Sequence, residues 1–437
     1  MTRLFRPALL LGLVASLLPL APASAAWTKP RSLERSGWYA TSETDVAVSR
    51  KGGVVTAWTA DNDSDDVGYR VRFRRLSPTG VPGSLRTLSP PSHTPAHVSV
   101  AVDDDGDAIV GWASYDMDLQ AWQVYVRRVS RGNAIGPLLR VSNLSYDGWL
   151  PSVAMTPGGA AAVVYDAFQQ QVFRRISLGN RLGRLIPQAP ATRTPPTLVA
   201  TRSGAFLTTV QVPGAPDRIK AVRINPDGTT RSRDISGATR LADHLATVET
   251  DRKGSAYVAY ASIDTTTTPY RGSAYLRRWR SDGVLGAAHR LSPTTHFVSN
   301  LASATDLEGD TMVAWTRPVG DTFRLYARFC RRGGSLGPVL GLGAISGQRD
   351  NNDYQNPRAS LVLDDDGDGV ITWTTEPSYD YFVVWARRVH RDGTLGPKVR
   401  LRSGAVVPRT ATSPGGRVRV LMTRLSAPYS PLVVSGP

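Results

Sequence analysis

Residues 105–112 read DGDAIVGW, and residues 366–373 read DGDGVITW. Each stretch places an Asp-Gly turn before a short apolar run, and each run ends in a tryptophan at the sixth position after the glycine. A glycine followed at the sixth position by a large residue recurs along the chain at nearly regular intervals. The occurrences are Gly52/Trp58, Gly106/Trp112, Gly159/Tyr165, Gly204/Val210, Gly254/Tyr260, Gly309/Trp315, Gly367/Trp373 and Gly416/Met422. Such internal self-similarity indicates a repeat architecture.

A second motif, an arginine strand, follows the first seven of these runs. It is usually an Arg-Arg pair before an apolar residue, and a glycine-bearing turn comes after it. The seven motifs are Arg74-Arg75-Leu76, Arg127-Arg128-Val129, Arg174-Arg175-Ile176, Val222-Arg223-Ile224, Arg277-Arg278-Trp279, Arg328-Phe329-Cys330 and Arg387-Arg388-Val389. Each unit therefore resolves into four short strands: one rich in small residues, one apolar, the arginine strand and a last strand such as residues 138–141. Four antiparallel strands at a period of about 50 residues predict one blade of a β-propeller.

The fold class expected from these repeats is all-β, a single β-propeller of eight four-stranded blades. A seven-bladed ring is the alternative, because the unit that contains Val210 lacks the aromatic residue. The last unit supplies only three strands, at residues 409–413, 418–423 and 431–434. We therefore expect residues 27–34, at the start of the mature chain, to add the missing fourth strand and close the ring.

Residues 1–25 have the pattern of a secretory signal peptide. Arg3 and Arg6 precede an apolar stretch over residues 8–20, and small residues follow up to Ala26. An apolar stretch of this length is too short to cross a bilayer core about 30 Å thick. We expect cleavage after Ala25 or Ala26 and a secreted, extracellular propeller domain over residues 26–437, with no membrane span and no lipid anchor.

The chain carries a formal net charge of +16, and all but five of its 52 basic residues are arginine. A basic exported protein is attracted to anionic polymers. However, adjacent residues of a strand point to opposite sides of the sheet, so the Arg-Arg pairs do not form one basic stripe. We expect one arginine of each pair to meet an acidic residue of the neighbouring blade, or the pairs to lie on solvated faces, and nucleic acid is not the expected partner. The lone Cys330 takes a position filled elsewhere by apolar residues, which predicts a buried structural role.

Aromatic and polar residues gather in the loops after the second and fourth strands, which share one face of a propeller. The candidate ligand-binding residues are Trp38, Tyr39, Tyr115, Asp116, Tyr146, Trp149, Asn352, Asp353, Tyr354, Tyr379 and Tyr381. Aromatic rings stack on sugar rings while Asn and Asp bond to hydroxyl groups. The alternative is that Trp38 and Trp149 simply cover the ends of blades.

Three aspartate-rich segments are candidates for metal binding. Asp61, Asp63 and Asp65 lie in the loop of the first unit and offer the oxygen ligands that Ca²⁺ prefers, although the spacing lacks the glycine of a calcium loop. The runs at 103–107 and 364–368 are also rich in aspartate, but we interpret them as Asp-Gly turns. His93 and His97 are four positions apart with Pro95 between them, which is not a metal-binding geometry on a strand. No cofactor is expected apart from this possible Ca²⁺.

At this level the chain resembles secreted bacterial β-propeller proteins. The order of Asp-Gly turn, apolar strand, further strand and glycine turn is similar to the repeats of TolB-like propellers, which lack the Arg-Arg pair. It also resembles the sialidase superfamily in layout, but the Asp box Ser-x-Asp-x-Gly-x-Thr-Trp and a Phe-Arg-Ile-Pro segment do not occur. The resemblance implies a propeller and assigns no activity, because this fold hosts many functions.

Two functions follow as hypotheses. The first is a monomeric, non-enzymatic extracellular protein that binds an anionic or neutral polysaccharide or a cell-wall polymer. The second is a secreted glycan hydrolase or lyase on the same scaffold. The sequence contains no recognisable nucleophile or metal-protease motif, so catalytic residues remain unassigned. Two carboxylates, or a histidine with an aspartate, at the mouth of the central channel would favour the enzyme.

Overall fold

The glycine that marks each repeat forms a tight turn between two strands. Gly106 has a φ of 96° and Gly367 a φ of 81°, a region that favours glycine. A side-chain oxygen three positions before the glycine closes each turn by accepting the N–H of the residue after the glycine. These oxygens belong to Ser49, Asp103, Thr156, Thr201, Asp251, Asp306, Asp364 and Ser413. The aspartates of the 103–107 and 364–368 runs therefore stabilise turns, as predicted.

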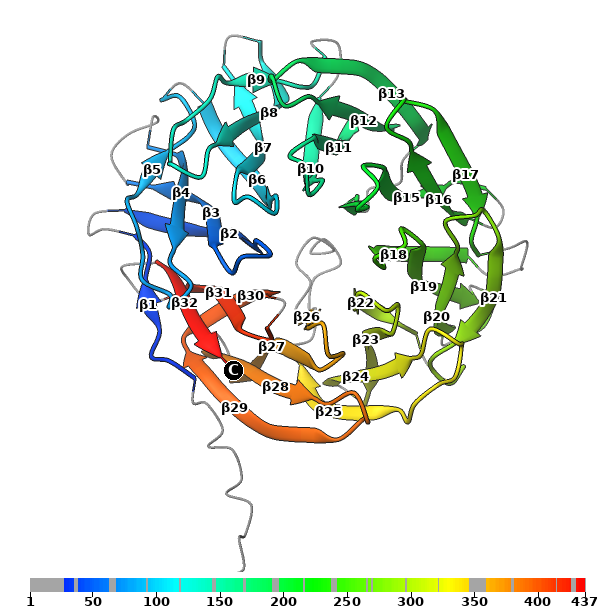
Figure 1. Cartoon of the computed structure of the whole chain (residues 1–437). Coiled ribbons are helices and arrows are strands. Elements are labelled where there is room, and N and C mark those ends of the chain that lie inside the picture. Colours follow the sequence, from blue (N-terminus) through cyan, green and yellow to red (C-terminus); the bar gives the residue numbers. More distant parts are fainter. Residues whose placement is uncertain are drawn as a thin grey trace, which may run out of the picture.

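The computed structural model describes residues 27–34, 38–62, 68–91, 93–117, 119–143, 147–167, 170–190, 196–214, 217–236, 242–264, 266–268, 270–294, 297–320, 322–345, 359–378, 381–413, 415–425 and 430–436. Within these ranges the strands form eight four-stranded antiparallel sheets, so the predicted eight-bladed propeller is confirmed and the seven-bladed alternative is wrong. Figure 1 shows the blades arranged in a ring about a common axis.

Blades 1 to 4 run in chain order from the innermost to the outermost strand. Their strands are β2 (Tyr39–Val48), β3 (Val54–Asp61), β4 (Arg70–Leu76) and β5 (Arg86–Thr87); β6 (His93–Val102), β7 (Ala108–Asp116), β8 (Ala121–Val129) and β9 (Leu139–Arg140); β10 (Gly148–Met155), β11 (Ala161–Ala167), β12 (Gln170–Ile176) and β13 (Leu182–Pro190); and β14 (Leu198–Ala200), β15 (Phe206–Val212), β16 (Arg218–Ile224) and β17 (Thr230–Asp234).

Blades 5 to 7 repeat this order, and blade 8 takes its outermost strand from the start of the chain. The strands are β18 (Ala242–Thr250), β19 (Ala256–Asp264), β20 (Arg271–Trp279) and β21 (Leu285–Arg290); β22 (Ser299–Thr305), β23 (Thr311–Val319), β24 (Thr322–Cys330) and β25 (Leu340–Ile345); β26 (Ala359–Leu363), β27 (Gly369–Ser378), β28 (Tyr381–Val389) and β29 (Leu395–Ser403); and β30 (Ala405–Thr412), β31 (Val418–Arg424), β32 (Pro431–Gly436) and β1 (Arg31–Ser32).

The predicted closure by residues 27–34 is confirmed, because β1 pairs antiparallel with β32. Backbone bonds extend beyond the two strand residues: the Thr28 N–H donates to the Ser435 carbonyl and the Leu33 N–H donates to the Pro431 carbonyl, both at 2.9 Å. Leu33 is fully buried in the core shared by blades 8 and 1. The two ends of the chain therefore complete one sheet, and β1 and β32 lie side by side in Figure 1.

Among the described residues, the first arginine of five arginine strands joins neighbouring blades through backbone carbonyls. In blade 2, Arg127 Nη1 donates to the Leu88 carbonyl at the end of blade 1, at 2.6 Å, and its Nε donates to the Gly136 carbonyl at 3.0 Å. The equivalent bonds to the preceding blade are Arg74–Leu33, Arg174–Val141, Arg277–Ile235 and Arg328–Leu291. These five bonds go to carbonyl oxygens rather than to acidic side chains of the neighbouring blade. Their forked guanidinium satisfies two backbone acceptors at once.

The large residue six positions after each glycine packs in the wedge between blades. Trp58, Trp112 and Trp373 are fully buried, and Val210 of blade 4 is buried as well. Cys330 is buried in the core between blades 5 and 6, which confirms its predicted structural role. Among the described residues, no helix is long and apolar enough to span a membrane.

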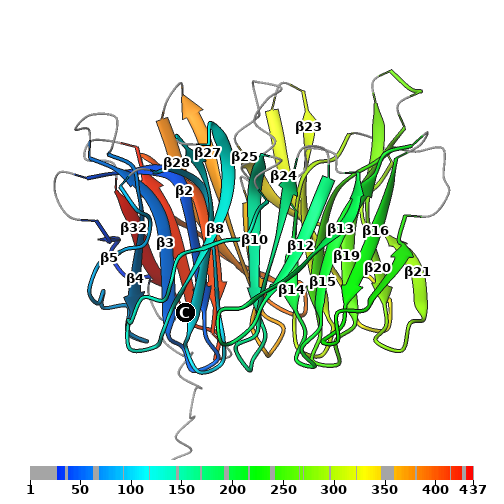
Figure 2. The same cartoon turned by 90° about the horizontal axis from the view of Figure 1, so that it is seen from above.

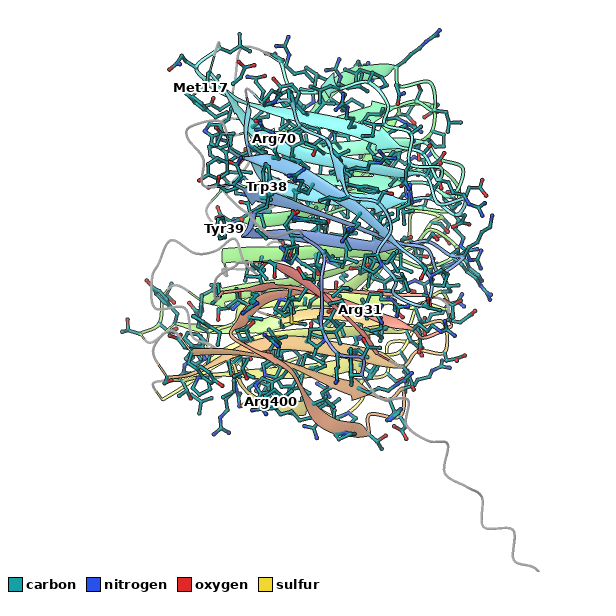
Figure 3. All side chains as sticks on the ribbon, turned by 90° about the vertical axis from the view of Figure 1, so that its left-hand side faces the viewer. Arg31, Trp38, Tyr39, Arg70, Met117 and Arg400 are labelled. Atoms are coloured by element: carbon teal, nitrogen blue, oxygen red, sulfur yellow. The ribbon has the colours of Figure 1, made fainter. Side chains whose placement is uncertain are left out.

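The ring has two distinct rims. The turn face carries the glycine turns between first and second strands. The loop face carries the loops between second and third strands and the passages from one blade to the next. Figure 2 shows the ring edge-on, with the C-terminal end of the chain near its lower rim. Figure 3 shows Trp38, Tyr39 and Met117 toward one rim, the loop face.

Candidate functional site

Four rings form a continuous aromatic cluster on the loop face, where blade 2 meets blade 3. The ring centroids of Trp122 and Trp149 are 4.0 Å apart. Tyr115 lies edge-on to Trp122 at 5.8 Å, and the imidazole of His97 lies 5.3 Å from Trp149. These residues are half-buried, so part of each side chain packs against the protein and part is accessible.

Strand register brings the cluster together. Tyr115 on β7 pairs directly with Trp122 on β8, whereas Trp149 comes from the start of β10 in the next blade. Asp147 holds this junction, because its Oδ1 accepts the Trp122 N–H at 2.9 Å. Asp116 bonds a neighbouring side chain: its Oδ2 accepts the hydroxyl proton of the buried Tyr125 at 3.0 Å. Burial of the phenol, together with this bond, raises the pKa of Tyr125.

A β-bulge recurs in the innermost strands and sets the direction of the residues at the loop face. In β6 the register shifts between Ala96 and Ser99, and His97 has a φ of 55°; in β10 it shifts after Trp149, and Leu150 has a φ of 50°. A bulge adds one residue against its partner strand and reorients the side chains next to it. Equivalent residues with positive φ are Leu245, Asn300 and Val407.

A carboxyl–imidazole pair borders the cluster on the innermost strands β2 and β6. Glu43 of blade 1 lies with its Oε1 3.2 Å from His97 Nδ1, and its Oε2 accepts the His97 backbone N–H. Burial raises the pKa of Glu43 to about 7, although the backbone bond opposes the shift, and burial lowers the pKa of His97 to about 4. Between these values Glu43 keeps its proton and His97 is neutral, so the pair can donate and accept a proton near neutral pH.

The structure brings only some of the predicted ligand-binding residues together. Tyr115, Asp116 and Trp149 meet at the aromatic cluster. Trp38 instead packs on the core of blades 8 and 1, and Arg72 lies 3.8 Å above its ring, so Trp38 covers a blade end. Tyr39 begins β2 of blade 1, whereas Tyr381, 45% exposed, begins β28 of blade 7, so neither lies at the junction of blades 2 and 3. Five further candidates lie outside the described residues: Tyr146, Asn352, Asp353, Tyr354 and Tyr379.

The calcium hypothesis can be examined only at Asp61, which ends β3, because Asp63 and Asp65 lie outside the described residues. Within the described ranges, no group of three or more His, Cys, Asp or Glu side chains could hold a metal ion.

Trp122 and the Glu43–His97 contact were not predicted from the sequence. A signal for the contact does exist: both residues stand nine positions before the glycine of their repeat, at Gly52 and Gly106. Equivalent positions of neighbouring inner strands lie side by side in a propeller. Aligning the repeats on their glycines therefore places Glu43 next to His97.

No protein-family model matches the chain, and no curated protein is similar to it in sequence. Many solved structures share its fold. A protein of unknown function from Dyadobacter fermentans is 11% identical, with a TM-score of 0.46 over 94% of this chain and 99% of the other. An ulvan lyase of polysaccharide lyase family PL25 is 10% identical, with a TM-score of 0.47 over 85% of this chain and 94% of the other. The β-propeller domain of the Trilobed protease from Pyrococcus furiosus is 10% identical, with a TM-score of 0.46 over 84% and 97%. These similarities concern the propeller fold alone.

Proposed function

We propose that the protein is exported and binds a polysaccharide on its loop face, at the aromatic cluster of Tyr115, Trp122 and Trp149. The observation that carries this proposal is the packing of these rings at the junction of blades 2 and 3. There Asp147 accepts the backbone N–H of Trp122, and Asp116 accepts the hydroxyl proton of the neighbouring Tyr125. Rigid, half-buried aromatic rings provide a large stacking surface at little entropic cost. Cell-wall or other extracellular polymers are the expected class of ligand.

The proposal is tested by affinity electrophoresis in gels that contain neutral or anionic polysaccharides. Trp122→Ala is expected to weaken binding about five- to thirtyfold, because loss of one stacked ring costs about 1–2 kcal/mol. Tyr270→Ala is the matched control: Tyr270 is 55% exposed beside the equivalent loop of blade 5, outside the cluster. Equal retention of the wild type and Trp122→Ala on every polymer that binds would contradict the proposal.

A second candidate function, a glycan hydrolase or lyase, is favoured by the Glu43–His97 pair. The pair lies beside Trp149, so a sugar stacked on the cluster would place its bonds near a protonated carboxyl and a neutral imidazole. These are the groups that general acid and base steps require. Release of new reducing ends or unsaturated products is the assay. We expect Glu43→Gln to abolish release and leave binding intact; a fully active Glu43→Gln protein would exclude the pair from catalysis.

A further inference from the structure

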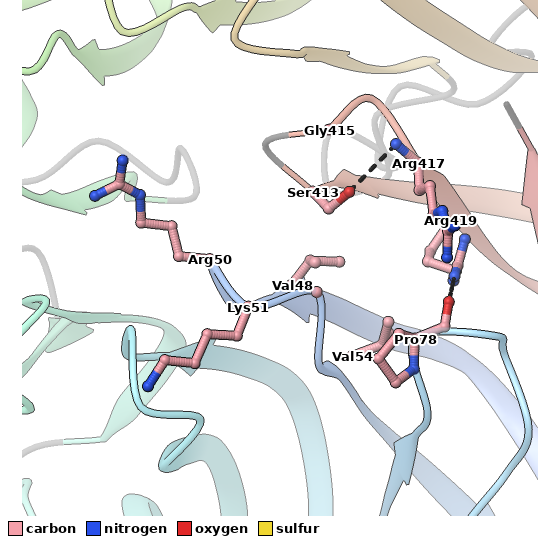
Figure 4. Close-up of a pocket in the computed structure, with 10 residues that line it drawn as sticks. Val48, Arg50, Lys51, Val54, Pro78, Ser413, Gly415, Arg417 and Arg419 are labelled. Atoms are coloured by element: carbon pink, nitrogen blue, oxygen red, sulfur yellow. Dashed lines mark hydrogen bonds between the residues drawn. The ribbon is translucent and has the colours of Figure 1, made fainter.

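A basic pocket lies on the turn face, at the seam where blade 8 meets blade 1. Its volume is about 210 Å³. Figure 4 shows Arg417 and Arg419 on one wall and the turn that carries Arg50 and Lys51 on the other. The remaining lining residues are Val48, Gly52, Val54, Pro78, Ser413 and Gly415. The pocket is thus on the rim opposite the aromatic cluster.

Four of the ten lining residues are cationic and none is acidic. Lys51 is compensated, because its Nζ lies 2.9 Å from Asp105 Oδ1, and the charge of Arg50 acts on Asp365. Arg417 and Arg419 differ from these two: among the described residues neither makes an ion pair with a carboxylate. Two guanidinium groups without an anionic partner therefore share one wall of the pocket.

Arg419 occupies a position that is apolar elsewhere in the ring, yet it is only 4% exposed. The residues three positions after the glycine in the other seven blades are Val55, Ile109, Ala162, Leu207, Tyr257, Met312 and Val370, all buried. Burial lowers the pKa of Arg419, and the charge of Arg417 lowers it further. An anion in the pocket would relieve both effects.

The break in the repeat explains why this pocket exists. In blade 1, Val55 pairs with Arg75, and Arg75 Nη2 crosses to blade 2 to bond the Val129 and Ser130 carbonyls. In blade 8 the partner of Arg419 is Ser435, so the crossing guanidinium is missing from the third strand. Arg419 replaces it in part.

The replacement leaves Arg419 only partly satisfied. It donates to the carbonyl of Pro78 in blade 1 and, at 3.0 Å, to that of Val418. Its buried Nε finds no acceptor among the described residues. Ser435 is shorter than the arginine found at this third-strand position in blade 1, so it leaves space. The unbonded Nε of Arg419 lies beside that space.

We propose that this pocket is a binding site for a tetrahedral oxyanion, a phosphate or a sulfate group, held by Arg417 and Arg419. Both guanidinium groups supply forked N–H donors that match the oxygens of such a group. The volume admits one such group with its hydration. The oxyanion is either a free ion or a substituent of an anionic polymer, and the two sources share the same recognition chemistry.

The first experiment is calorimetric titration of the full mature chain with inorganic phosphate, at constant ionic strength set by chloride. We expect a dissociation constant of about 1 mM or tighter. Arg417→Ser is expected to weaken binding roughly tenfold or more. Blade 5 carries Ser255 at the equivalent position, so the fold accommodates this substitution. Arg231→Ser, which removes one charge from the exposed strand β17, is the matched control and should bind phosphate as the wild type does. No phosphate binding beyond chloride, or an equal loss in both variants, would overturn the proposal.

The second experiment separates the two sources of the oxyanion by retention on dextran sulfate, with uncharged dextran as the blank. If the site takes a polymer substituent, Arg417→Ser elutes at lower salt than Arg231→Ser, and free phosphate removes this difference. If the site takes a free ion, phosphate binds but the two variants elute together. Both results support an oxyanion site. Trp122→Ala should leave phosphate binding unchanged, so failure of this proposal is distinct from failure of polysaccharide binding on the loop face.

Discussion

Leu33 provides the sharpest test of the ring closure. It follows β1, is fully buried, and packs with Trp58, Leu421 and Val433 between blades 8 and 1. Leu33→Ala should leave a cavity and cost about 3 kcal/mol, within the 2–5 kcal/mol typical of buried leucine truncation. The entropy of cooperative unfolding for a ring of this size is roughly 0.9 kcal/mol per kelvin. Dividing the loss of unfolding free energy by this entropy gives a fall in melting temperature of about 3 to 4 °C. Calorimetry measures this shift directly.

Leu88→Ala is the matched control for that measurement. Leu88 is equally buried and occupies the equivalent position after the outermost strand of blade 1, where its N–H donates to the Val71 carbonyl at 2.8 Å. The two substitutions differ only in connection: the Leu88 segment continues from its own blade, whereas the Leu33 segment comes from the other end of the chain. Both should destabilise the ring to a similar extent. A destabilised Leu88→Ala beside an unchanged Leu33→Ala would refute the closure.

Three further predictions concern single side chains. Arg127→Lys should lower stability by about 1–3 kcal/mol in urea unfolding, because lysine cannot bond the Leu88 and Gly136 carbonyls together; an unchanged midpoint would show that this clamp is dispensable. Burial raises the pKa of Glu249 to about 8, so its protonated form stabilises the fold fully below about pH 4.5, and this contribution is lost as the pH rises through 8. Glu249→Gln should flatten that decline in melting temperature, and an identical pH profile would contradict the assignment. Burial raises the pKa of Cys330 to about 11, so the native protein should react with a thiol reagent only after unfolding, and rapid labelling would show an exposed thiol.

The blades could be predicted from the sequence because each one is specified by residues close together in the chain. In seven of the eight units, the turn glycine, the buried large residue six positions later and the arginine strand all lie in one short segment, and each has a local physical reason. Gly106 needs a positive φ, and Trp112 fills the wedge beside it. The count of eight follows from counting these local patterns. The closure followed from a missing strand, which is also a local observation.

The candidate site could be predicted only in part, because its residues come from three blades. Tyr115 and Trp149 stood out as aromatic loop residues, and the structure brings them together. Trp38 stood out for the same reason but packs on a blade end, since composition does not distinguish a ring that stacks on a ligand from one that covers a core. The Glu43–His97 contact joins two blades, so neither segment reveals it alone, and it emerges only when the repeats are aligned on their glycines.

The basic character of the protein follows largely from its architecture. The first arginine of a pair, such as Arg127, bonds carbonyl oxygens, and these acceptors satisfy its donors without cancelling its charge. A propeller held together in this way becomes strongly basic even where no anionic ligand is bound, so net charge alone does not locate a binding surface. The informative charges are those that depart from the repeat. Arg419 replaces an apolar residue in blade 8, which is why we expect anion binding there rather than along the arginine strands.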